Sequence, residues 1–151
     1  MMTGKKNLLL IFRANFRTVT HLPLVSFELR EKYLLVVGHG ARNSFTEMVE
    51  ASSMISRKVQ ETNSRFLLVD YRYLKVNVAM NQAFNIVKRY ELKQPEIKTL
   101  TMAAVFEGQG LEFGRYWQKV GIQRGFYIEV FIDIKEAEQW LLGKIESEMA
   151  G

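Results

Sequence analysis

The chain has 151 residues, 48% of them hydrophobic and 25% charged, which predicts one packed globular domain and excludes a disordered chain. It has no cysteine, which excludes disulfides, thiolate zinc sites and a cysteine nucleophile. The formal net charge is +5, which raises the question of a nucleic-acid partner.

The positive excess is concentrated at the amino end. Residues 1–27 contain four basic side chains and no acidic one, while the rest of the chain is close to neutral. No segment matches a helix-turn-helix, a zinc finger or an RNA-recognition motif, so we expect no nucleic-acid partner. The apolar run of residues 8–12 is too short for a signal-peptide core or a membrane span, so we expect no membrane insertion and a cytoplasmic location. Residues 1–21 are interpreted as a basic extension, with an extra strand around residues 18–20 as the open alternative.

The first regular elements form a predicted β-hairpin. Residues 24–29 alternate apolar and polar side chains, which indicates a half-exposed strand. Residues 30–32 make a polar turn, and residues 33–37 form a continuous apolar run, typical of a strand covered on both faces. The two strands are close enough in sequence to pair.

The stretch VVGHGARNS, residues 36–44, then carries the chain towards a helix. Ser44 followed by Glu47 has the spacing of a capping box, and apolar side chains at helical intervals predict a helix through Thr62. Ser44 is therefore expected to be the amino-terminal cap of that helix.

The loop inside this stretch has two interpretations. Gly38, His39, Gly40 and Arg42 could bind an anion, because glycines allow close approach and arginine supplies charge. Alternatively, the glycines only permit the turn. No Gly-Lys-Ser/Thr ending follows, so it is not a P-loop, and His39 has no partner visible in the sequence. We favour the structural interpretation.

Three further strand–helix units follow. We expect strands at residues 66–69, 100–106 and 126–132. The helix after the first begins near Asn77 and is stopped by Pro95, and the next begins at Gly110 and is broken by Gly121 and Gly125. Asp133 caps the last helix.

This order predicts a single α/β domain over residues 22–146. Strands separated by single helices must run parallel, so the sheet is mixed and mostly parallel, with about five strands and four helices.

Catalytic and cofactor motifs are not evident. Gly108, Gly110 and Gly114 with Asp133 imitate a dinucleotide fingerprint, but the spacing is wrong and too little chain follows. No G-x-S-x-G elbow is present, and the two histidines lie far apart in sequence. We therefore expect no enzyme, no cofactor and no metal.

The carboxyl-terminal segment carries a family resemblance. Residues 130–141, VFIDIKEAEQWL, are similar to the V-F-x-D-x-x-E-A-x-x-W-L ending of STAS-like domains, in particular the small bacterial proteins similar to the sporulation anti-sigma factor antagonist. The strands ending at Gly38 and Asp70 match the same layout, and the resemblance covers roughly residues 22–145. It implies helices largely on one face of the sheet, and roles in regulation and binding rather than catalysis. The fold of this group also partly resembles CRAL-TRIO lipid-transfer domains.

One feature of that family is missing. The antagonists carry a phosphorylated serine at the start of the second helix, whereas residues 71–98 of this chain contain no serine or threonine. The phosphorylation switch cannot be carried over, and Asn77 is left as the expected helix cap.

Two functions remain open. The first is a non-catalytic regulatory domain that binds a protein partner, with a homodimer also open. The second is a sensor that binds an anion or a lipid-like small ligand at the carboxyl ends of the strands. The candidate contact residues, shared by both, are Asp70, Tyr71, Arg72, Tyr73 and Asn77, together with Gly38, His39, Gly40 and Arg42.

Overall fold

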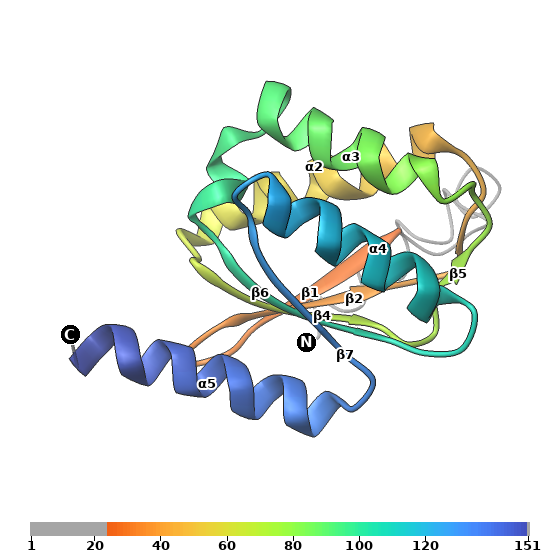
Figure 1. The fold of residues 1–151 in the computed structure, drawn as a ribbon. Coiled ribbons are helices and arrows are strands. Elements are labelled where there is room, and N and C mark those ends of the chain that lie inside the picture. The colour runs from red at the N-terminus through yellow and green to blue at the C-terminus, as the bar shows by residue number, and fades with distance from the viewer. Residues whose placement is uncertain (1–23, 151) are drawn as a thin grey trace, which may run out of the picture.

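The computed structural model describes residues 24–150, which form three layers with the main sheet in the middle (Figure 1). The predicted extension over residues 1–21 and its alternative strand lie outside this range. The strands are β1 Val25–Leu29, β2 Leu34–Gly38, β3 Ala41–Arg42, β4 Phe66–Tyr71, β5 Lys75–Val76, β6 Thr101–Phe106 and β7 Tyr127–Phe131. The helices are α2 Phe45–Thr62, α3 Asn81–Lys93, the 3₁₀ helix η1 Pro95–Thr99, α4 Gly110–Gln123 and α5 Ile134–Ala150.

The main sheet has the order β1-β2-β4-β6-β7. Strands β1 and β2 are antiparallel, with Val25 opposite Gly38, and every other neighbouring pair is parallel. The predicted hairpin, the mixed sheet of five strands and the four helices are thus confirmed. The parallel strands all end at one edge of the sheet, which brings their following loops together.

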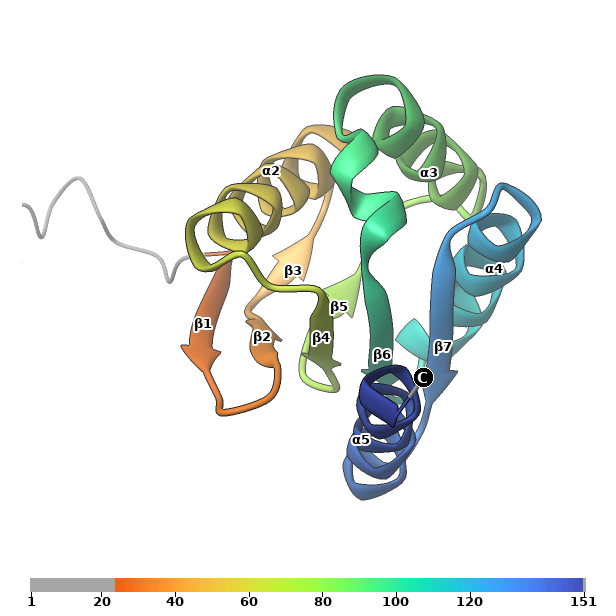
Figure 2. The same ribbon diagram turned by 90° about the vertical axis from the view of Figure 1, so that its left-hand side faces the viewer.

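Side chains along each strand alternate between two cores. Helices α2, α3 and α4 cover one face and α5 covers the other (Figure 2). In β6, for example, Met102, Ala104 and Phe106 face the three helices, whereas Ala103 and Val105 face α5. The central strands are apolar throughout because both of their faces are buried.

A second sheet, which the sequence did not predict, joins two of the loops at the carboxyl edge. Strands β3 and β5 are parallel, with Ala41 opposite Lys75 and Arg42 opposite Val76. The Asn77 amide extends the pair by donating to the Arg42 carbonyl at 2.8 Å. This short pairing holds the segment after β2 against the segment after β4.

Two predicted helix boundaries are wrong. Helix α3 begins at Asn81 rather than near Asn77, because residues 75–76 are extended in β5 and Asn77 continues the pairing with β3. Asn77 is therefore no cap; its side-chain amide donates to Asn43 Oδ1 at 2.9 Å. Gly121 does not break α4 but lies inside it, where a Cβ atom would come within 2.7 Å of Ile128.

None of the helices between residues 24 and 150 is both long enough and apolar enough to cross a membrane.

Candidate functional site

The turn after β2 is held by its own backbone and by the helix cap. Gly40 has φ = 72°, in the left-handed region where a β-branched side chain is strained. The Ser44 hydroxyl accepts from the Glu47 amide at 3.2 Å, and the Glu47 carboxylate accepts from the Asn43 amide at 2.7 Å. The predicted cap is confirmed, with the glutamate reaching one residue further back than in the usual capping box.

Gly38 has a different reason to be glycine. A Cβ atom at this position would lie 2.5 Å from the ring of Tyr71, closer than real Cβ contacts. The glycine therefore lets the Tyr71 ring, from the neighbouring strand, lie directly against the end of β2. That ring makes an edge-to-face contact with Phe106, with centroids 5.4 Å apart.

His39 does have a partner, and the expectation of none was wrong. Its Nε2 lies 2.8 Å from the Ser26 hydroxyl, and its backbone amide donates to the Leu24 carbonyl at 2.9 Å. Ser26 is on the antiparallel strand β1, so the pairing arises only from the hairpin register. The imidazole thus ties the turn to the edge strand.

Arg42 is buried, with only 4% of its surface exposed. Its guanidinium donates to three neutral carbonyls, of Leu24 at 2.9 Å, of His39 at 3.0 Å and of Ala41 at 3.5 Å. Burial lowers the pKa of Arg42, because a charge removed from water loses its hydration. An exposed role in partner contact does not fit this position; the side chain faces the interior.

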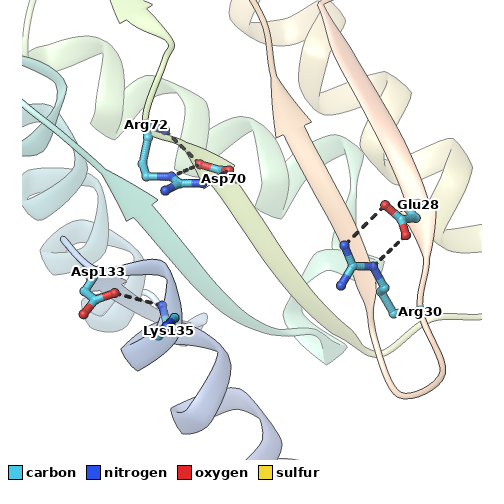
Figure 3. A network of polar contacts seen from close by, with 6 residues as sticks. All are labelled: Glu28, Arg30, Asp70, Arg72, Asp133 and Lys135. Carbon is cyan, nitrogen blue, oxygen red and sulfur yellow. Dashed lines mark hydrogen bonds and ion pairs between the residues drawn. The ribbon is translucent and has the colours of Figure 1, made fainter.

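Asp70 and Arg72 form a clamp at the end of β4 (Figure 3). The Asp70 carboxylate accepts from Arg72 Nε at 2.9 Å, from its Nη2 at 2.8 Å and from its backbone amide at 3.1 Å. Burial acts to raise the pKa of Asp70, but the hydrogen bonds and charge of Arg72 together leave it below its usual value. The same bonds raise the pKa of Arg72.

The clamp positions an exposed aromatic side chain. Tyr73 is 69% exposed, and the guanidinium carbon of Arg72 lies 5.2 Å from its ring centroid. The two tyrosines of the candidate surface therefore point in opposite directions, Tyr71 inwards and Tyr73 outwards. Among residues 70–73, Tyr73 and Arg72 are therefore the ones accessible to a partner.

A cavity of about 70 Å³ lies between the carboxyl ends of the parallel strands and the three helices. Tyr71, Phe106 and Arg42 reach it from the strand ends, and Tyr90 and Trp117 reach it from α3 and α4. Most of the wall is apolar. A smaller cavity of about 30 Å³ adjoins it and shares Tyr71, Tyr90 and Trp117.

The polar groups of this wall are hydroxyl, indole and guanidinium groups, all of which can donate hydrogen bonds. Trp117 Nε1 donates to the Tyr90 hydroxyl at 3.2 Å. Burial raises the pKa of both Tyr71 and Tyr90, so both hydroxyls stay protonated. The Ser52 hydroxyl donates to Gln94 Oε1 at 2.9 Å, and the Gln94 amide donates back to the Ser52 carbonyl at 3.1 Å, so this pair is satisfied internally.

The structure brings together most of the predicted site residues, but not on one surface. Gly38 and Arg42 adjoin Tyr71 inside, whereas Arg72 and Tyr73 lie outside. Ser52, Tyr90 and Trp117 were predicted only as members of helix faces, and no sequence signal separates a core aromatic from a cavity wall. Within residues 24–150, no cluster of three or more histidine, aspartate or glutamate side chains could hold a metal ion.

Comparison with known proteins bears on the fold. No family model and no curated protein sequence matches the chain. A crystal structure of an uncharacterised protein of the DUF3478 family with a SpoIIAA-like fold, from Shewanella loihica PV-4, does match, with a TM-score of 0.50 and 16% sequence identity. The match covers 78% of this chain and 91% of that one.

The chain has a SpoIIAA-like fold. The resemblance of its carboxyl-terminal segment to STAS-like domains is therefore confirmed at the level of the fold. At 16% identity the comparison carries the architecture alone and leaves the function to the site.

Proposed function

We propose that this protein is a non-catalytic binding domain that senses a small ligand in the cavity at the carboxyl ends of its strands. The observation that carries the proposal is the cavity itself, about 70 Å³ in volume, mostly apolar and edged by a few convergent polar groups. Ligand sites in open α/β sheets collect at this edge, and apolar walls with few polar groups are typical of them.

The polar chemistry of the cavity supports binding rather than catalysis. A general base or an activated nucleophile needs a pKa close to the working pH. The pKa values of Tyr71 and Tyr90 are shifted upwards, away from neutrality, so both remain weak nucleophiles. The hydroxyls and the guanidinium can orient a ligand by donating hydrogen bonds.

A thermal-shift screen of the full chain against small metabolites and fatty acids tests this function. A ligand of the cavity should raise the melting temperature, and the Ala51→Leu variant should abolish that shift because the larger side chain occupies the cavity wall beside the ligand. Leu92→Ala, an exposed change on α3, is the control that should leave the shift intact. Flat melting curves with every compound would refute the proposal.

A second candidate function is contact with a protein partner through Tyr73. It is supported by the exposure of this ring and by the clamp that holds Arg72 beside it, since tyrosine and arginine are enriched among the residues that dominate interface energies. Pull-downs from the native host with immobilised full chain should lose a specific partner with Tyr73→Ala or Arg72→Glu. Leu92→Ala is the matched control, because Leu92 is 70% exposed on α3. A partner set that is the same for all variants would count against this role.

A further inference from the structure

Arg42 presents an unusual electrostatic situation inside the domain. Only 4% of its surface is exposed, and none of the ion pairs among the described residues includes it. Residues 1–23 and residue 151, which the structure does not describe, contain no aspartate or glutamate. Glu47 acts on the guanidinium only at longer range, and its carboxylate is bonded to the Asn43 amide. Buried charges in proteins are normally paired, because an isolated one is costly to desolvate.

The donors around this charge are incompletely used. A guanidinium has five N–H donors. Within the described residues, Arg42 donates from Nη1 to the His39 and Ala41 carbonyls and from Nη2 to the Leu24 carbonyl. The Tyr71 hydroxyl has no hydrogen bond to a described residue, and the Tyr90 hydroxyl accepts from Trp117 without donating to one. All three side chains line the same cavity.

The polar side chains of the cavity therefore suit a ligand that accepts hydrogen bonds. A carboxylate would accept from Arg42 and Tyr71 and neutralise the buried charge. An ammonium ligand would instead add a second positive charge beside the buried guanidinium of Arg42. The positive charge of Arg42 therefore favours a negatively charged ligand.

The remaining wall sets its size and shape. Met48, Ile55, Leu74, Ile86 and Phe113 supply apolar surface that suits hydrocarbon. An engineered apolar cavity of about 150 Å³ holds benzene, so a cavity of about 70 Å³ with an adjoining one of about 30 Å³ limits the hydrocarbon part of a ligand to a few carbon atoms. A second charged group would remain unpaired in this wall, which disfavours dicarboxylates, and phosphate would leave the apolar part empty.

We propose that the ligand of this cavity is a short-chain monocarboxylate, with its carboxylate bound by Arg42 and Tyr71 and its hydrocarbon part against the helices. The proposal rests on the function proposed above and specifies the chemical class of ligand. Arg42 then has a binding role in addition to its contacts with the β1 and β2 segments.

Calorimetric titration of the full chain with four probes tests the class of ligand. Sodium butyrate should bind about tenfold more tightly than butyramide, which has nearly the same shape without the charge, and more tightly than butylamine or inorganic phosphate. Butyramide, butylamine or phosphate binding as tightly as butyrate would overturn the carboxylate assignment. If none of the four probes binds although the wider screen yields a cavity ligand, the carboxylate proposal fails and the proposed function stands.

Variants test the two residues. Arg42→Gln should weaken butyrate binding about tenfold or more. Because this change also removes bonds to Leu24 and His39, Tyr71→Phe provides a second test that keeps the ring packing and removes only the hydroxyl; it should weaken butyrate several-fold. Tyr33→Phe is the matched control, since its hydroxyl bonds Glu138 far along the chain, and butyrate affinity should be unchanged. Unaltered butyrate affinity in Tyr71→Phe would overturn the proposed carboxylate site.

Discussion

The two faces of the central sheet are packed by different means. On one face a single helix, α5, lies on a centre of small and branched side chains, with Ala103 and Ala137 both fully buried, and Trp140 contacts the rings of Tyr127 and Phe131. On the other face three helices meet aromatic rings from the strand ends, and Phe106 contacts both Tyr71 and Trp117 at an angle. The cavity of about 70 Å³ lies on this face. Both faces therefore hold buried core, and the three-helix face also holds the candidate site.

Truncation on the α5 face should have the largest effect. Leu141→Ala removes a fully buried side chain of α5 and should lower the free energy of unfolding by about 3 kcal/mol, measured by urea denaturation. The half-buried Ile55, which lines the cavity, is the comparison on the other face, and Ile55→Ala should cost clearly less. Equal losses in the two variants would remove the distinction between the faces.

Enlarging an alanine should act differently on the two faces. Ala103→Leu overpacks the layer under α5 and should destabilise the protein by about 2.5 kcal/mol. Ala51→Leu places the same added volume beside the cavity and should leave stability unchanged or raise it. Chemical denaturation of both variants checks this, and a comparable loss in Ala51→Leu would show that the cavity wall is as tightly packed as the α5 layer.

The clamp of Asp70 and Arg72 at the end of β4 should make a pH-dependent contribution to the free energy of unfolding. Because the pKa of Asp70 is lower in the folded protein, its contribution is present above the usual carboxyl pKa of 3.8 and is lost as the pH falls through the lowered value. Arg72→Ala should therefore cost about 2 kcal/mol at neutral pH, with the difference from the parent protein narrowing in acid.

A matched control for that measurement is Arg30→Ala. Arg30 pairs with Glu28 at 2.8 Å (Figure 3), but both side chains are exposed, so the loss in free energy of unfolding should be much smaller. A cost in Arg72→Ala that stays constant down to the lowest pH would contradict the role given to the Asp70 carboxylate.

Loss of the α2 cap should have a moderate effect. Ser44→Ala removes the acceptor of the Glu47 amide at the start of the helix that forms one wall of the cavity, and should cost about 1 kcal/mol. Ser44→Asp, which keeps an acceptor, should restore most of that loss in thermal denaturation. Equal stability of Ser44→Ala and the parent protein would show that the cap is dispensable.

The smallest expected effect is at His39. On the sequence alone His39→Ala should be nearly silent; with the Ser26 hydroxyl 2.8 Å away, we expect a loss of about 0.5–1 kcal/mol. Ser26→Ala should lose a similar amount, and the double variant should lose less than the sum of the two, because both single changes remove the same bond. Fully additive losses would exclude a coupling between the two side chains.

Much of the fold could be predicted because it depends on local patterns. The continuous apolar strands, the helical spacing of apolar side chains after Ser44 and the cap itself follow from periodicity and backbone chemistry within a few residues. The errors at Asn77 and Gly121 have the opposite cause. The segment before α3 pairs with a distant strand, and Gly121 is a glycine inside α4 because a Cβ atom there would meet Ile128.

The sequence by itself determined the order of the elements, the mixed sheet and the edge at which loops gather, because alternation and crossover rules require no knowledge of packing. Only the tertiary structure decided which of those loop residues face inwards. Arg42 and Arg72 are both arginines that follow a strand, yet one is buried among neutral carbonyls and the other is clamped at the surface by Asp70. That difference arises from the β3–β5 pairing and from the position of Leu24 in the hairpin, both of which join segments far apart in the chain.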